Sequence, residues 1–273
     1  MLKDITLGQY FPGDTPIHRL DPRTKILLVV MYIVALFSAK GALSYAVVLF
    51  ALVSAIALSK ISLKTMLKSV KPILFIIIIT AVLNMFYTPG EVLVRFWIFK
   101  ITREGIETAF FMVLRIVMLI MGTFLLTYTT SPIMLTDGLE SLLNPLKKLK
   151  VPVHELAMMM SIALRFIPTL IEETEKIMNA QKARGAEFDT GGLVDKAKAL
   201  LPILVPLFVS SFRRADELAV AMESRCYHGG EGRTKLRELV MRRRDLIALA
   251  LGALLIAAVF ATRAAGFDWS ITQ

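Results

Sequence analysis

Apolar residues gather in five long runs, separated by polar and mostly basic segments. A straight helix needs about 20 apolar residues to cross a bilayer, within a range of roughly 17–25. The first, third and fifth runs are short by that measure, and snorkelling of Lys25 and Lys40 or local thinning of the bilayer would help the first to span. We predict five membrane-spanning helices: Ile26–Ala39, Ala42–Ser59, Pro72–Tyr87, Ile106–Tyr128 and Leu246–Ala261.

More than a hundred residues between the fourth and fifth runs show helical periodicity instead of bilayer-length apolar runs. Ser131-Pro132 is typical of a helix start, and the leucines that follow, through Leu146, predict an amphipathic helix at the inner membrane surface. A longer helix begins at Pro152, has apolar residues at steps of three or four, and is predicted to end near Gly185. A third helix is predicted from about Leu193 to Arg225.

The centre of this third helix is strongly apolar but short. Leu200–Phe212 has 13 residues and contains Pro202 and Pro206. Apolar runs of about 10–14 residues are more often buried or re-entrant than spanning. We therefore expect this helix not to cross the membrane, which leaves Arg184 and Arg225 on the same side.

Composition and charge set the class and the orientation. The chain is 56% apolar with a mean hydropathy of +0.64, whereas soluble domains are about 45–50% apolar. Of the 32 Lys and Arg residues, 26 fall on one side of the predicted spans, in the N-terminal segment, the loop Lys60–Lys71 and residues 131–245. Because positive charge concentrates in cytoplasmic loops, we predict a cytoplasmic N-terminus and an external C-terminus.

These patterns predict an all-α integral membrane protein with about five transmembrane helices and a cytoplasmic domain of long amphipathic helices. Residues 1–130 would hold the first four spans, 131–243 the cytoplasmic domain, and 244–273 the last span and the external C-terminus. The predicted location is the cell membrane, where the lipid bilayer surrounds the spans. Cytoplasmic loops explain the basic charge, so no nucleic-acid partner is expected.

Two arginines end the two longer cytoplasmic helices in similar contexts, and glycine pairs follow at Gly191-Gly192 and Gly229-Gly230. A cation near a helix C-terminus gains about 0.3–1 kcal/mol from the helix dipole, which is a sufficient structural reason for either arginine alone. The repetition, about 41 residues apart, supports a functional reading equally well. Small neighbours leave each guanidinium open to bidentate contact with a partner's carboxylate. The candidate docking residues are Ala183, Arg184, Gly185, Ser224, Arg225 and Cys226.

Catalytic chemistry finds little support. The three histidines lack metal-ligand spacing, Cys226 is the single cysteine, and the chain has no glycine-rich phosphate loop ending in Lys-Ser or Lys-Thr. Arg115 is charged and lies inside the fourth run, where we expect it to face protein or to pair with Glu107. We therefore expect no enzyme activity, no metal site and no cofactor on this chain.

Four segments closely resemble the transmembrane T component of energy-coupling factor transporters, the EcfT/CbiQ family. They are Leu20–Lys25, Ala163–Pro168, Gln181–Gly185 and Ala221–Tyr227, and the resemblance extends over nearly the full length. It implies that residues 131–243 form a coupling-helix domain whose arginines, Arg184 and Arg225, each dock one of two ABC-type ATPase subunits. It also implies a substrate-binding membrane S component for a vitamin or metal ion, with ATP and Mg bound by the ATPases. Ser224 and Cys226 depart from the usual Ala-Arg-Gly of the second motif.

Two other classes of function stay open at this stage. A conventional permease would bind and translocate its own substrate, and a membrane enzyme would need a nucleophile, metal or acid–base group. The lack of an evident polar site within the spans speaks against the first, and the lack of such a constellation speaks against the second.

Overall fold

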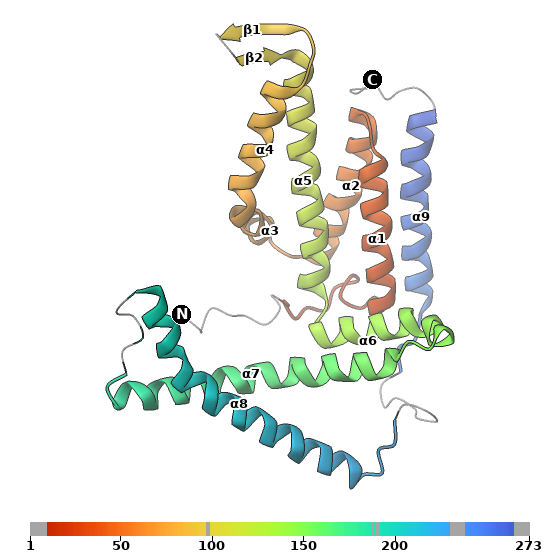
Figure 1. The fold of residues 1–273 in the computed structure, drawn as a ribbon. Helices are drawn as coiled ribbons and strands as arrows, with labels where there is room; N and C mark the ends of the chain where they lie inside the picture. The colour runs from red at the N-terminus through yellow and green to blue at the C-terminus, as the bar shows by residue number, and fades with distance from the viewer. Residues whose placement is uncertain (1–9, 97–98, 187, 189–191, 230–237, 265–273) are drawn as a thin grey trace. The chain divides into compact units, whose positions relative to one another are not determined.

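The computed structural model describes residues 10–96, 99–186, 188, 192–229 and 238–264. Helices account for most of them, which confirms the all-α fold class (Figure 1). Contacts divide the described chain into two units, which we call the bundle unit (residues 8–139 and from residue 239) and the two-helix unit (residues 140–238). The predictions that concern Gly191, Gly230 and the C-terminus beyond residue 264 fall outside the described residues.

The bundle unit contains α1 (Pro22–Ser38), α2 (Ala42–Ser59), α3 (Leu63–Val70), α4 (Leu74–Tyr87), α5 (Arg103–Thr129) and α9 (Arg243–Ala264). A turn of 3-10 helix, η2 (Lys71–Ile73), joins α3 to α4. Within this unit α1 packs against α9 and α5, and α4 packs against α5. Helices far apart in sequence, such as α1 and α9, are thereby brought into one bundle.

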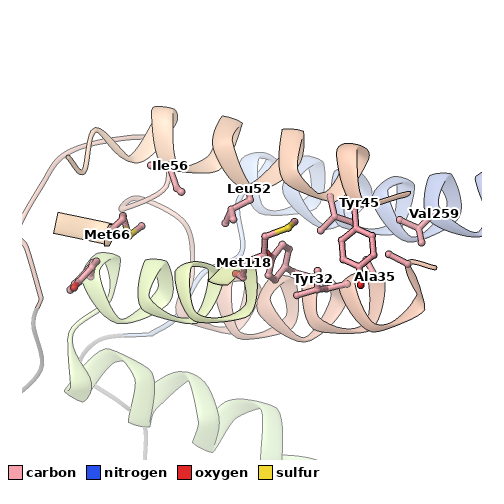
Figure 2. Packing of buried hydrophobic residues seen from close by; sticks show 12 residues of the cluster. Tyr32, Ala35, Tyr45, Leu52, Ile56, Met66, Met118 and Val259 are labelled. Atoms are coloured by element: carbon pink, nitrogen blue, oxygen red, sulfur yellow. Dashed lines mark hydrogen bonds between the residues drawn. The ribbon is translucent and has the colours of Figure 1, made fainter. Parts of the chain in front are cut away.

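Apolar side chains from α1, α2, α3, α5 and α9 form the core of the bundle. Tyr32 and Ala35 of α1, Leu52 of α2, Met118 of α5 and Val259 of α9 are buried together (Figure 2). The Tyr32 hydroxyl donates a hydrogen bond of 2.9 Å to the Met118 carbonyl, which satisfies the one polar atom of this ring. The core therefore fixes α1 against α5 through both packing and a hydrogen bond.

Five helical segments are long and apolar enough to cross a membrane. Four coincide with predicted spans: α2, the continuous segment Leu63–Tyr87, α5 and α9. The fifth is α7 (Val153–Ala183), whereas α1 is slightly shorter at 17 residues. The burial of α1 against α5 and α9 agrees with a span at 26–39, which stays a prediction. The second half of α7 is rich in Glu and Lys, which favours a position outside the bilayer. That position of α7 also stays a prediction.

Two elements of the bundle unit were not expected. The segment 60–71 was taken as a loop, but it contains α3, which begins where the Ser62 hydroxyl accepts a hydrogen bond from the Thr65 amide. Met66 and Val70 bury one face of this short helix. An antiparallel hairpin, β1 (Val92–Phe96) and β2 (Phe99–Thr102), joins α4 to α5.

The two-helix unit begins inside α6 (Pro132–Leu143), whose predicted start at Ser131-Pro132 is confirmed. The predicted continuation through Leu146 is wrong, because the chain changes to a 3-10 helix, η3 (Asn144–Leu149), where Pro145 interrupts the α-helical hydrogen bonds. Two helices of 31 residues follow, α7 and α8 (Leu193–Glu223). Both agree closely with their predicted ranges, and the described part of α8 is not among the segments suited to span.

Candidate functional site: two arginine-bearing helix ends

The first motif closes α7 with a Schellman turn. The Gly185 amide donates to the Lys182 carbonyl at 3.0 Å, and the Ala186 amide donates to the Gln181 carbonyl at 3.0 Å. Gly185 has a φ of +86°, in the left-handed region that this turn requires at the position after the cap. Arg184 therefore occupies the cap position itself, one residue before the chain reverses.

The second motif closes α8 in the same way. The Cys226 amide donates to the Glu223 carbonyl at 2.8 Å, and the Tyr227 amide donates to the Met222 carbonyl at 3.1 Å. The left-handed residue is Cys226, with a φ of +56°. Arg225 again occupies the cap position, so the similarity of the two sequences reflects identical hydrogen-bonding geometry.

The left-handed residue is the main difference between the two turns. A non-glycine residue in this conformation costs roughly 1–2 kcal/mol, because its Cβ approaches the following carbonyl. The His228 ring Nδ1 lies 2.9 Å from the Cys226 carbonyl and donates to it in the matching tautomer, which helps to hold this second turn. The departure from Ala-Arg-Gly therefore preserves the fold of the turn at an energetic cost.

Both arginine side chains are available to a partner. All three residues of each motif, 183–185 and 224–226, are exposed. Within the described part of the chain, neither Arg184 nor Arg225 forms an ion pair. The dipole of each helix places partial negative charge at the same end. Each motif thus presents a guanidinium without an ion-pair partner among the described residues, on a well-capped helix end.

The two helices are fastened to each other near the first motif. Pro206 has no amide hydrogen, so the Pro202 carbonyl lacks its partner within α8. The Gln181 side chain on α7 donates to this carbonyl at 3.4 Å. Gln181 therefore closes the α7 turn with its backbone and contacts α8 with its side chain.

A second contact holds the helices further from that end. The Glu173 carboxylate on α7 accepts hydrogen bonds from the Ser210 hydroxyl and from Arg214 Nη2, the latter at 2.6 Å. These donors lower the pKa of the Glu173 carboxyl, the Ser210 hydroxyl most of all and the Arg214 guanidinium next. We call Glu173, Ser210 and Arg214 the crossing clamp.

The two contacts show how much helix lies between the two arginines. Residues 173 and 181 on α7 meet residues 210 and 202 on α8, so the helices run in opposite directions across this contact (Figure 1). Arg184 lies just beyond the first contact, and Arg225 lies at the far end of α8. The path from Arg184 back to this contact on α7, and then along α8 to Arg225, is about 39 Å of helix at 1.5 Å per residue. A standard interface buries only about 800 Å² on each partner, so the two ends suit separate contacts.

The other singled-out residues have structural partners. Arg115 Nε donates to the Tyr45 hydroxyl at 2.7 Å and Arg115 Nη2 to the Ala39 carbonyl at 3.4 Å, which confirms that Arg115 faces protein. Glu107 pairs with Arg103 at 3.5 Å instead of with Arg115. Arg213 and Glu217 form an i,i+4 ion pair at 3.9 Å with both side chains exposed.

The histidines lie apart and make local contacts. His18 lies beside Thr15 and the Phe11 carbonyl, and His154 Nδ1 lies 2.9 Å from a Glu140 carboxylate oxygen. A search of the described residues finds no group of three or more His, Cys, Asp or Glu side chains arranged to hold a metal ion.

Known proteins similar to this chain match it over nearly its full length. A family model described as cobalt transport protein, CbiQ, matches residues 13–236. The chain is 58% identical over 259 residues to the energy-coupling factor transporter transmembrane protein EcfT of Clostridium kluyveri, covering 94% of this chain and 96% of that protein. The protein of the same name from Bacillus subtilis is 47% identical over 265 residues, covering 97% of this chain and 100% of its own length. These matches confirm the resemblance seen in the motifs. The chain therefore belongs to the CbiQ/EcfT family of energy-coupling factor transporter transmembrane proteins.

Proposed function

We propose that this chain is the transmembrane coupling subunit of an energy-coupling factor importer. Arg184 and Arg225 each dock one of two cytoplasmic ABC-type ATPase subunits, which bind ATP and Mg²⁺. ATP binding and hydrolysis move these subunits, and α7 and α8 pass the movement to a membrane S component that carries a vitamin or metal ion. The chain itself contributes position and force and supplies no catalytic group.

The observation that carries the proposal is the geometric equivalence of the two helix ends. Each end places an exposed arginine at the cap of a Schellman turn, and about 39 Å of helix lies between them. The turn fixes the backbone that carries each arginine, and the planar guanidinium can pair bidentately with a carboxylate, which lowers the side-chain freedom lost per hydrogen bond. Two such ends suit two partner subunits better than one.

The proposal needs a surface for the S component, and α8 offers one. Ile203 and Ser210 are buried, whereas the opposite side of α8 exposes an apolar stripe. Apolar surface that is contiguous and unpaired in a protein marks a contact with another protein or with the membrane. The stripe consists of Leu201, Leu204, Val205, Phe208, Val209 and Phe212.

The experiment that tests the proposal compares complexes purified in mild detergent from native membranes. Truncating one partner of a desolvated charge pair costs roughly 2–5 kcal/mol, so the double variant Arg184→Ala/Arg225→Ala should lose its ATPase subunits and ATP-driven uptake. Arg213→Ala is the matched control, because Arg213 is an exposed arginine on α8 with only a weak ion pair.

Either of two results would contradict the coupling role. One is normal uptake by the double variant. The other is substrate binding by the purified chain alone, which would favour a permease. The spans should remain folded in every variant, because both arginines lie outside the buried core.

A further inference from the structure

The segment Leu20–Lys25, which opens α1, has buried charges at an unexpected place. Asp21 is 7% exposed and Lys25 is 5% exposed, and Asp245 beside them is 3% exposed. Charged side chains are seldom buried this fully unless specific partners hold them. Their partners show what the segment does.

Lys25 holds the chain as it leaves the bundle unit. Its ammonium donates to the Thr129 carbonyl at 2.8 Å and to the Thr130 hydroxyl at 3.1 Å. Thr129 is the last residue of α5, where helix carbonyls lack partners and a cation is favoured. The Lys25 side chain therefore caps α5 directly before α6 begins.

The middle of α6 is also held against the start of α1. Gly138 is buried, and a Cβ added to it would lie 2.9 Å from the Pro22 Cβ. The absence of a side chain allows the backbone of α6 to approach α1 this closely. The two contacts together fix the outgoing connection over residues 129–138.

The chain that returns to the bundle unit is held by the same segment. Arg23 Nη2 donates to the Leu239 carbonyl at 2.6 Å, at the first residue of the returning chain. The Asp245 carboxylate accepts one hydrogen bond from the Asp21 amide and one from the Arg242 amide, each at 2.8 Å. The start of α9 is thereby tied to the residue that caps α1.

We propose that Leu20–Lys25 is a mechanical junction that positions both connections between the membrane spans and the coupling helices, with Lys25 and Asp245 as positioning residues. The inference rests on the coupling function proposed above. Every force that passes between the two units along the chain must pass residues 129–139 or 239–245, and side chains of this one segment hold both.

Stability alone does not account for a charged junction. Buried ionic groups replaced together by apolar residues of similar volume often leave a protein equally stable. We infer that the charges are retained here because they fix one geometry of the connections. Backbone groups from three parts of the chain accept or donate here, among them those of Asp21, Thr129, Leu239 and Arg242. A loosened junction should therefore leave docking of the ATPase subunits intact and lower the uptake per ATP hydrolysed.

The test uses Lys25→Met, which keeps the aliphatic stem and removes the ammonium, in the full complex reconstituted in liposomes. Lys64→Met is the matched control, since Lys64 is exposed on α3. We expect Lys25→Met to retain its ATPase subunits and an ATP hydrolysis rate within twofold of wild type. Uptake per ATP hydrolysed should fall at least tenfold, while the control stays within twofold.

The ratio of uptake to hydrolysis separates positioning from general damage, because partial unfolding lowers both quantities together. An unchanged ratio in Lys25→Met would overturn the junction, and so would loss of the ATPase subunits from a monodisperse variant. If Lys25→Met does not accumulate, Thr130→Val decides, since it removes only one acceptor of the Lys25 ammonium. We expect its ratio to fall about threefold, and an unchanged ratio overturns the proposal. Failure of the wild-type chain to bring down any ATPase would refute the coupling function itself.

Discussion

Glu173→Gln is the perturbation that most directly tests how α7 and α8 are held together. The wild-type carboxylate accepts from the Ser210 hydroxyl and the Arg214 guanidinium, while the amide keeps only one acceptor oxygen. Hydrogen bonds to charged groups contribute about 1.5–3 kcal/mol each. The Arg214 and Glu173 side chains are 33% and 19% exposed, so water replaces part of what is lost. We expect a loss of about 2 kcal/mol, or roughly a thirtyfold shift toward separated helices.

Amide hydrogen exchange in α8 around residues 207–214 measures this shift, because local opening sets the exchange rate there. Exchange should quicken about thirtyfold in Glu173→Gln and stay near wild type in Glu172→Gln, where the carboxylate is exposed. The charge exchange Glu173→Arg with Arg214→Glu should recover part of the protection. Equal exchange in the Glu173 and Glu172 variants would refute the crossing clamp.

The pH dependence of the crossing clamp follows from the lowered pKa of Glu173. A carboxyl whose folded pKa is depressed stabilises the folded state fully above its unfolded pKa, about 4.3, and loses this stabilisation as pH falls through the folded pKa. The difference between wild type and Glu173→Gln should therefore be complete at neutral pH and narrow below about pH 4. A difference that widens on acidification would contradict the assignment.

Three further substitutions test the turns and the core. Gly185→Ala should destabilise the end of α7 by about 1 kcal/mol, because alanine resists the left-handed conformation, and faster exchange of the last α7 amides would report it. Cys226→Gly should have the opposite sign at the end of α8, with slower exchange there and docking retained; equal effects of one sign at both ends would contradict the geometry. Gly122→Val should lower the melting temperature of the chain, since an added Cβ would lie 2.4 Å from the Tyr32 ring, and an unchanged value would show that the α1–α5 contact is looser than described.

Local signals in the sequence were sufficient for most elements. Bilayer-length apolar runs identify α2, α5 and α9, and Ser131-Pro132 and Pro152 mark the starts of α6 and α7. The hairpin lies between two predicted spans and was not expected there. Its segment, Val92–Thr102, is rich in β-branched and aromatic residues, which is typical of strands. The helix α3 was missed because eight residues carry too little periodicity to stand out.

The candidate site was predicted in part. Repetition of a small residue, Arg and a small residue identified both helix ends, and the Schellman geometry explains the glycine that follows Arg184. The Schellman turn after Arg225 could not be predicted from the sequence, because Cys226 stands where glycine is usual. Glu173 and Arg214 are 41 residues apart, and nothing local to either predicts their pairing. Tertiary contacts of this kind require the structure.

The central claim is that each arginine-bearing helix end touches an ATPase subunit, and Cys226 allows a direct measurement. It is the single cysteine of the chain, it is exposed, and it adjoins Arg225. A short thiol-specific photo-cross-linker attached to Cys226 in the assembled transporter should join this chain to an ATPase subunit. The variant Ala183→Cys/Cys226→Ser should do the same beside Arg184. A transporter that remains active yet gives no ATPase cross-link from either position would contradict the account.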